Sequence, residues 1–360
     1  MTDSTRAGRA ALRGPCHGEG GPAPADTTRL LALARSGDQQ AFAGLVGPYH
    51  RELQVHCYRM LGSIQDAEDV MQEVLVRAWR HLGRFEHRSS VRNWLYQIAT
   101  NRCLTFQARA AATAPALGAG LVLPRPNAPD VEVVALQPCP DSRLDQLAEH
   151  DPQARYDLQE SVDLAFLSTI QLLPARQRAV LLLRDVLAFS AAETASLLNT
   201  TVAAVNSALQ RGRAVLQEHR ASGRLRPERP AASSAAERSI LGRYLAAWHA
   251  CDIPALVALL REDAVLTMPP FPMAYRGRDA IGQFFATVPA GGRLDQITLV
   301  PTRANRQPAV AAYVRDPDGG SATAYGIMVF TVDGTMIGEI TGFADPALFR
   351  FFGLPGHLES

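Results

Sequence analysis

The sequence predicts a multidomain protein in which two all-α helical domains are followed by one α+β domain. Residues 26–111 and 158–222 carry apolar residues at the period of about 3.6 that is typical of amphipathic helices. Residues 235–350 begin with one amphipathic helix and continue with short apolar runs separated by Gly and Asp, which is a strand-and-turn pattern.

The segments between these domains have a different composition. Residues 112–157 contain repeated prolines, which break helices, and many acidic residues, so we expect an acidic, Pro-rich linker. Residues 223–234 are expected to form a second, polar linker. Residues 1–25 and 351–360 are expected to be tails.

Composition limits the class of protein. The net charge is only +1, so a DNA-binding surface would have to come from local clustering of Arg. The cysteines are scattered and form no CxxC pair, so neither a disulfide framework nor a zinc knuckle is expected, and a reducing cytoplasm fits best. We also expect no cofactor and no metal site. No apolar run approaches the roughly 20 residues that span a bilayer, so no membrane association is expected. The cysteines are Cys16, Cys57, Cys103, Cys139 and Cys251.

The first helical module contains a helix with an acidic face. Ser63 followed by Asp66 has capping-box spacing and predicts the start of this helix. Asp66, Asp69 and Glu73 then share one face, away from the apolar stripe. From the residues alone, this face is either an ordinary solvated surface or a docking surface.

The next helical segment, residues 91–110, is basic and contains no acidic residue. Its amides, its Arg residues and Tyr96 suit unstacked single-stranded bases, because rings stack, amides read base edges and Arg holds phosphate. An ordinary basic surface helix is the alternative.

The second helical module contains a predicted helix-turn-helix. Ser190 and Glu193 form a capping box, a tight turn follows at residues 199–201, and Thr201 is expected to cap the next helix. Val205, Leu209 and Leu216 face inward on that helix and leave a small, polar and basic face suited to a major groove. The alternative is a plain three-helix bundle. The outward residues are Ala203, Asn206, Ser207, Gln210, Arg211 and Arg213.

Together the two modules resemble the extracytoplasmic-function (ECF) sigma factors of the sigma-70 family. The first module resembles sigma region 2 in the segment DAEDVMQEVLVRAWRHLGRF and in the later segment WLYQIATNRCL. The second module resembles sigma region 4 in the segment LPARQRAVLLLRDVLAFSAAETASLLNTTVAAVNSALQRGRAVL. The two blocks cover about half of the chain in the family's order. The resemblance implies that the protein binds core RNA polymerase, through its beta and beta-prime subunits, and recognises −10 and −35 promoter elements to initiate transcription of a specific regulon.

The resemblance also implies roles for particular residues. Docking on the polymerase clamp is implied for Asp66, Asp69, Glu73 and Arg77. Capture of the melted −10 strand is implied for Arg92, Asn93, Tyr96, Gln97, Asn101 and Arg102. Reading of the −35 duplex is implied for the outward face of the helix-turn-helix, although the family often has Lys-Ser-Arg where this chain has Asn206, Ser207 and Ala208. Fewer phosphate contacts would weaken −35 binding and its salt dependence.

The linker between the modules is acidic, since the chain has eight Asp and Glu residues against two Arg between Asn127 and Glu160. It is either a solvated tether or, as the resemblance implies, a segment that runs through the active-centre and RNA-exit channels of polymerase. The acidic residues are Asp130, Glu132, Asp141, Asp145, Glu149, Asp151, Asp157 and Glu160.

The C-terminal domain resembles SnoaL-like (cystatin-like) domains, mainly in element order and in the turn from Tyr275 to Ile281. The resemblance implies an α+β cone that encloses a pocket for a candidate small ligand, and a built-in regulator of the sigma factor. Most of the candidate residues to line such a pocket can instead be explained as core residues. They are Tyr244, Trp248, Met268, Phe271, Tyr275, Phe284 and Tyr313.

The acid–base residues of this domain form no convincing catalytic pair, so we expect no enzyme activity. His249 and Asp252 fit a helix end and a cap, Asp279 is expected to cap the helix after Gly277, and Asp263 is the remaining candidate. Two other functions stay open. One is a helix-turn-helix regulator that never touches polymerase, and the other is a small-molecule enzyme fused to a DNA-binding part.

Overall fold

The structure, a computed structural model, describes residues 24–85, 89–110, 124–145, 162–221, 234–316 and 320–359. The chain groups into two compact units, Met1–His50 and Arg51–Ser360. The first unit contains helix α1 (Pro24–Arg35) and the first half of α2 (Gln39–Leu61). Gly37 ends α1 with a φ of 97°, and the Asp38 carboxylate accepts the backbone N–H groups of Gln40 and Ala41 at 2.8 and 3.0 Å. This pair of bonds caps the start of α2.

The second unit begins with the rest of α2, followed by α3 (Ile64–His81) and α4 (Val91–Ala110). The predicted cap of α3 is confirmed, because the Ser63 hydroxyl accepts the N–H of Asp66 at 3.1 Å. Val70, Val74 and Ala78 are buried along one side of α3, where it packs against α4. Amphipathic spacing therefore places the opposite, acidic side of α3 at the surface.

The second helical module consists of α7 (Leu164–Gln171), α8 (Ala175–Leu181), a π-helical turn (Leu182–Val186), α9 (Ala191–Leu197) and α10 (Val202–Ala221). Both halves of the predicted capping box between Ser190 and Glu193 are present at the start of α9. The Thr201 hydroxyl accepts the N–H of Ala204 at 3.2 Å, as expected for the cap of α10. These contacts confirm the helix-turn-helix formed by α9 and α10.

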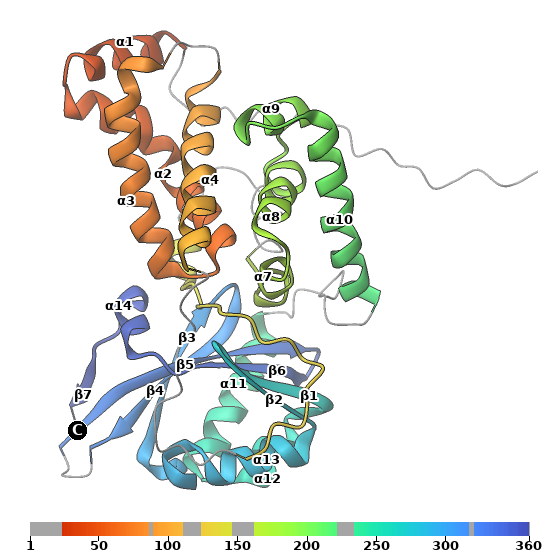
Figure 1. The fold of residues 1–360 in the computed structure, drawn as a ribbon. Coiled ribbons are helices and arrows are strands. Elements are labelled where there is room, and N and C mark those ends of the chain that lie inside the picture. Colours follow the sequence, from red (N-terminus) through yellow and green to blue (C-terminus); the bar gives the residue numbers. More distant parts are fainter. Residues whose placement is uncertain are drawn as a thin grey trace, which may run out of the picture. The chain divides into compact units, whose positions relative to one another are not determined.

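The C-terminal domain begins with α11 (Ser234–His249) and α12 (Ile253–Ala258), and α13 (Arg278–Thr287) follows the first two strands. The strands are β1 (Leu260–Met268), β2 (Phe271–Arg276), β3 (Ile297–Ala304), β4 (Gln307–Arg315), β5 (Ser321–Asp333) and β6 (Met336–Phe343). They form one sheet in the order β2-β1-β6-β5-β4-β3, in which only β1 and β6 pair in parallel along this path. The three helices lie against one face of the sheet (Figure 1).

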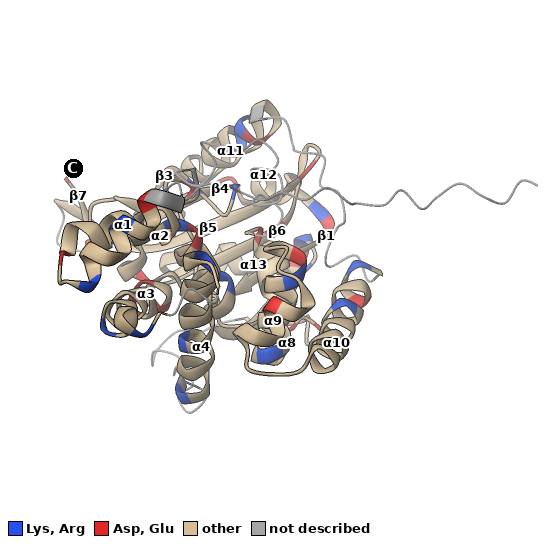
Figure 2. Ribbon diagram, turned by 90° about the horizontal axis from the view of Figure 1, so that it is seen from above, with Lys and Arg blue, Asp and Glu red and all other residues tan. Residues whose placement is uncertain are grey.

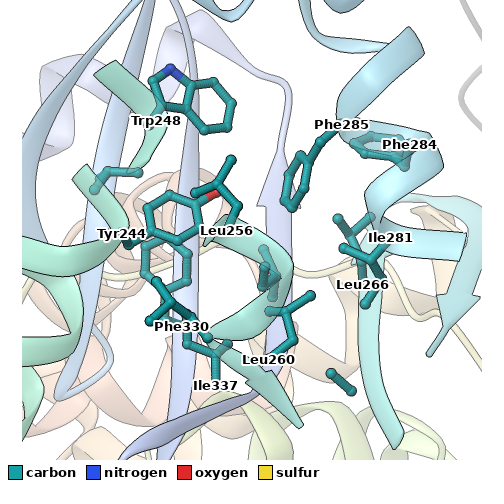
Figure 3. Packing of buried hydrophobic residues seen from close by; sticks show 14 of the residues in the cluster. Tyr244, Trp248, Leu256, Leu260, Leu266, Ile281, Phe284, Phe285, Phe330 and Ile337 are labelled. Carbon is teal, nitrogen blue, oxygen red and sulfur yellow. The ribbon is translucent and has the colours of Figure 1, made fainter. Parts of the chain in front are cut away.

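The sheet and its helices enclose an aromatic core. Figure 3 shows Trp248 of α11 and Phe285 of α13 facing each other, and their ring centroids are 5.9 Å apart. Tyr244 packs beside them and is fully buried. Irregularities in the β1–β2, β4–β5 and β5–β6 pairings bend the strands around this core. The predicted α+β fold is therefore confirmed.

The prediction of a C-terminal tail at residues 351–360 is wrong for most of that segment. The short helix α14 (Phe349–Phe352) extends into it, and β7 (His357–Glu359) pairs with β5 in an antiparallel register. The Tyr313 hydroxyl donates to the carbonyl of Pro355 at 3.0 Å, which fixes the connection between them. A strand of three residues is too short to show the alternation of apolar and polar residues that would have revealed this pairing.

Candidate nucleic-acid and polymerase interfaces

The outward face of α10 is set by the burial of its opposite face. Val205, Leu209 and Leu216 are buried, and Gly212 lies so close to α8 that a Cβ there would be 3.2 Å from the Leu181 side chain. All six residues predicted to read the −35 duplex are exposed. They are Ala203, Asn206, Ser207, Gln210, Arg211 and Arg213.

One hydrogen bond and one ion pair hold the Arg side chains of this face in place. Arg211 donates to the Ser207 hydroxyl at 2.8 Å, and Arg213 donates to both oxygens of Asp185 at 2.8 and 2.6 Å. The bonds to Asp185 raise the pKa of Arg213. Arg184 lines the same shallow polar groove as Asn206. Sequence reasoning missed Arg184 and Asp185 because they lie in the π-helical turn, outside the helix-turn-helix.

The candidate −10 face on α4 is only partly exposed. Arg92, Asn93 and Gln97 are half-buried and Asn101 is exposed, whereas Tyr96 and Arg102 are buried. The expectation that Tyr96 lies on the exposed polar side is therefore wrong. Its ring packs edge-on against His56 and Phe189, at centroid distances of 5.2 Å for each.

Arg92 is held by charge and by aromatic rings. Its guanidinium donates to both oxygens of Glu52 and lies 4.9 Å from the Tyr96 ring and 5.1 Å from the Phe189 ring. Phe189 precedes the helix-turn-helix, so this contact joins the second helical module to α4. Basic segments of both α4 and α10 are blue in Figure 2.

Other residues of the −10 face also contact α9. The Asn93 amide donates to Glu193 at 3.1 Å, and the Asn101 amide donates to the carbonyls of Gln97 and Leu197 at 2.9 and 3.4 Å. Two of the amides expected to read bases, those of Asn93 and Asn101, are therefore bound to α9.

The acidic face of α3 is mostly exposed. Asp69, Glu73 and Arg77 are exposed, and Asp66 is half-buried. Burial raises the pKa of Asp66, the bond from Ser63 opposes this, and the nearby charge of Asp69 adds to it. Glu73 forms an ion pair with Arg102, so one expected polymerase contact is bound to one expected −10 contact.

The linker does not behave as a solvated tether where the structure describes it. Residues 124–140 are followed by helix α5 (Asp141–Asp145). Asp130 pairs with Arg276 at 2.8 Å, and Asp141 pairs with Arg303 at 3.0 Å. The Tyr275 hydroxyl donates to the carbonyl of Pro124 at 2.9 Å. Glu132 is exposed, the side chain of Asp145 is not described, and Glu149, Asp151, Asp157 and Glu160 lie outside the described residues.

Asn305 is the centre of a buried hydrogen-bond network that we call the Asn305 hub. It lies in the turn between β3 and β4 with a φ of 53°, and its exposed fraction is 0%. Its backbone N–H and side-chain Oδ1 bond to the carbonyl and N–H of Cys139, both at 2.8 Å. Its Nδ2 donates to the Tyr58 hydroxyl at 2.9 Å and to the carbonyl of Val162 at 2.7 Å. One amide thus joins the sheet, α2, the linker and the segment before α7.

Tyr58 extends the hub toward the start of α3. Its hydroxyl donates to the carbonyl of Gln137 at 2.7 Å, and the Gln137 side chain accepts from the Ser63 hydroxyl at 2.8 Å. Burial raises the pKa of Tyr58 well above its ordinary value. Nothing in the sequence pattern pointed to Asn305, since a turn asparagine is usually exposed.

The C-terminal domain contains a cavity in its apolar core. Of the seven residues predicted to line a pocket, Trp248, Met268 and Phe284 line this cavity. Tyr244 lies deeper in the core, and the hydroxyls of Tyr275 and Tyr313 donate to backbone carbonyls elsewhere. Phe271 packs at the edge of the core.

The acid–base candidates of this domain lie away from the residues that line the cavity. His249 ends α11, and Asp252 caps α12 by accepting the N–H of Ala255 at 2.9 Å, as expected. Asp263 pairs with Arg261. The expectation that Asp279 caps α13 is wrong, because Gly277 holds the cap position and Asp279 lies in the first turn.

The described residues contain no cluster of three or more His, Cys, Asp or Glu that could hold a metal ion. Cys57, Cys103 and Cys139 are buried free thiols, and Cys251 is an exposed one. Among the same residues, no helix combines the length and the apolar character needed to cross a membrane.

Comparison with known proteins identifies all three folded parts. The sigma-70 region 2 family matches residues 45–113, the sigma-70 region 4 family matches residues 163–216, and the SnoaL-like domain family matches residues 241–340. The chain is 40% identical to ECF RNA polymerase sigma factor SigG of Mycobacterium tuberculosis (strain ATCC 25618 / H37Rv) over 334 residues, which cover 92% of this chain and 87% of SigG. The chain belongs to the ECF family of RNA polymerase sigma factors.

This sigma factor is also 29% identical to ECF sigma factor SigW of Bacillus subtilis (strain 168) over 190 residues, or 53% of this chain and 94% of SigW. Its fold is similar to the crystal structure of Mycobacterium tuberculosis SigJ, with a TM-score of 0.53 and 24% identity over 86% of this chain and 100% of that chain. The C-terminal SnoaL-like domain therefore accompanies sigma regions 2 and 4 in one ECF sigma factor.

Proposed function

We propose that this sigma factor reads the −35 duplex with the exposed face of α10, captures the −10 strand with α4 and grips core polymerase with the acidic face of α3. The exposed, polar and basic face of α10 supports the first assignment, because a helix of that kind fits a major groove. On α4, the four residues within reach of DNA are Arg92, Asn93, Gln97 and Asn101. Tyr96 and Arg102 act from beneath that face by positioning it.

The single observation that carries the regulatory part of the proposal is the Asn305 hub. We infer that the C-terminal domain restrains initiation by holding the linker and α2 in place while α9 covers the −10 face of α4. Removal of the Asn305 amide would leave the Cys139 N–H and the Val162 carbonyl without their buried partner, at about 1–3 kcal/mol for each unsatisfied group. The closed arrangement then becomes less stable relative to an open one in which α4 reaches DNA.

The regulatory proposal is tested with Asn305→Gly, which keeps the left-handed backbone but removes the amide. In run-off transcription with sigma-free core polymerase, we expect more transcript from a cognate promoter than with the unchanged chain. Deleting residues 235–360 should also increase the amount of transcript. Unchanged open-complex formation in both variants would refute the restraint.

The polymerase-binding part has a separate test. The full chain should be retained by core polymerase in a pull-down and should confer start-site selection. A helix-turn-helix regulator that acts without polymerase would bind DNA but fail in both assays. We place the protein in the cytoplasm, where transcription takes place, and genome-wide mapping of start sites would define its regulon.

We assign no catalytic role to the C-terminal domain. None of the candidates His249, Asp252, Asp263 and Asp279 lines its cavity, so no proton donor or acceptor among them reaches a molecule bound there. Turnover of a small molecule by the purified chain would overturn this assignment and favour the fused-enzyme hypothesis.

A further inference from the structure

The first turn of α10 presents an exposed apolar side chain at the end of the helix that is assigned to the −35 duplex. Val202 is 44% exposed, and it is one of four exposed large hydrophobic residues in the described part of the chain. We propose that Val202 reads a thymine of the −35 element by packing against the C5 methyl group of that base. The inference rests on the proposed role of α10, and it adds a particular base and the residue that selects it.

Two local hydrogen bonds fix the start of α10 and with it the position of Val202. The Thr201 hydroxyl accepts the N–H of Ala204 at 3.2 Å, and the Thr201 carbonyl accepts the N–H of Val205 at 3.0 Å. Val205 is fully buried, so it anchors this turn to the rest of the module while Val202 stays at the surface. The N-terminal residues of a recognition helix contact base edges in the major groove, so Val202 lies where a base can meet it.

The chemistry of this first turn suits a methyl group. Ala203 and Ala204 beside Val202 are also exposed, and the turn contains no acidic residue. A valine side chain has no hydrogen-bonding group, and thymine is the base that presents a methyl group in the major groove, whereas cytosine presents an amino group. One χ1 rotamer of valine dominates in a helix, so Val202 loses little conformational freedom when it packs against a base.

The arginines that could read guanine lie farther along α10. Arg211 and Arg213 come more than two turns after Val202, about 14 Å or more along the helix axis, and both already donate to side chains of the protein at 2.6 to 2.8 Å. Asn206 is the exposed polar residue one turn after Val202, about 6 Å away along the axis, and an asparagine suits adenine. At about 3.4 Å per base pair, the thymine should therefore lie within about two base pairs of the base that Asn206 contacts.

The probe is a short DNA duplex that the full chain selects from a library with a randomised central segment. The six −35 candidates are exposed in this arrangement, so the full chain is tested without polymerase. Each thymine of the selected duplex is then replaced in turn by deoxyuridine, which differs from thymidine only in lacking the C5 methyl group. Fluorescence anisotropy measures the affinity of each duplex for the unchanged chain, for Val202→Ala and for the control Gln217→Ala.

We expect one thymine at which deoxyuridine weakens binding of the unchanged chain by about fourfold, as expected for one buried methyl group. Val202→Ala should weaken binding of the thymine duplex by a similar factor, and it should bind the thymine and deoxyuridine duplexes equally. Gln217→Ala should keep the full effect of deoxyuridine. Because Val202 is exposed and alanine is the stronger helix former, Val202→Ala should fold as the unchanged chain does, which thermal denaturation checks.

A double variant, Asn206→Ala with Arg211→Ala, separates failure of this inference from failure of the proposed function. If the double variant binds the selected duplex more weakly but deoxyuridine has no effect at any thymine, α10 reads DNA without Val202 and the inference alone is wrong. A deoxyuridine effect that persists in Val202→Ala assigns the methyl contact to another residue and also overturns the inference. If the unchanged chain selects no duplex, the proposed role of α10 fails, and the inference fails with it.

Discussion

His56 is a fully buried imidazole between α2 and α4. Its Nε2 lies 2.9 Å from the Thr100 hydroxyl, and burial, together with the charges of Arg59 and Arg92, lowers its pKa to about 3. The ring is therefore neutral in the folded chain, whereas it has a pKa of about 6.5 in an unfolded one. Below about pH 6.5 the unfolded state binds the extra proton, so stability falls as the pH falls through this range.

The expected size of this effect is about 1.4 kcal/mol of unfolding free energy per pH unit below about pH 6.5. Urea denaturation at about pH 7.5 and about pH 5 measures it. In His56→Gln, which cannot take up the proton, the decrease in stability between the two pH values should be smaller by about 2 kcal/mol. An identical decrease in the variant and the unchanged chain would show that His56 is not the group responsible.

At the scale of single elements, α9 depends on its first turn. The Ser190 hydroxyl accepts the N–H of Glu193 at 3.2 Å, and the Glu193 carboxylate accepts the N–H of Ser190 at 2.8 Å. These bonds lower the pKa of Glu193. Ser190→Ala should destabilise region 4 by about 1 kcal/mol, and Ser190→Asp should restore most of it. Thermal denaturation checks this, and equal melting of Ser190→Ala and Ser190→Asp would contradict the capping role.

Helix α10 carries a prediction about DNA. Asn206→Ala combined with Arg211→Ala should weaken binding to the −35 duplex by about 1–3 kcal/mol for each side chain that reads a base. Gln217→Ala is the control, because Gln217 is also exposed on α10 but lies beyond the predicted face. Fluorescence anisotropy over a salt series measures both the affinity and its salt dependence, which becomes flatter when a side chain that binds phosphate is removed. If Gln217→Ala weakens binding to the −35 duplex as much as the double variant does, then Asn206 and Arg211 do not read the −35 bases.

At the scale of the whole molecule, Cys139 reports on the docking of the linker. This residue is 4% exposed, and burial raises the pKa of its thiol to about 12. Because the thiolate is the reactive form, alkylation in the folded chain should be slow. Asn305→Gly should free Cys139 from the Asn305 hub and increase the rate of its alkylation several-fold. Binding of core polymerase should have the same effect if it opens the Asn305 hub.

Alkylation with iodoacetamide followed by peptide mass spectrometry measures this rate. Cys251, which is exposed, serves as an internal control whose labelling should stay constant. If Cys139 labels at the same rate in Asn305→Gly and in the unchanged chain, the Asn305 amide does not hold the linker.

The features that could be predicted from the sequence are local ones. The caps at Ser63, Ser190 and Thr201, and the inward and outward faces of α10, depend on residues at most a few positions apart, so spacing alone reveals them. The same holds for the order of the two helical domains and the α+β domain. The −35 candidates are all exposed for this reason, since one clear apolar stripe defines the opposite face.

Only the tertiary structure decided the features that join distant segments. Helix α4 has no clear apolar stripe, so spacing could not tell that Tyr96 and Arg102 are buried against other helices. Asn305 bonds with Tyr58 across 247 positions of the chain, and no local pattern records such a pairing. Local hydrogen bonds and amphipathic spacing thus determined the elements and their faces. Which faces are covered, and by what, depends on packing between residues that the sequence keeps far apart.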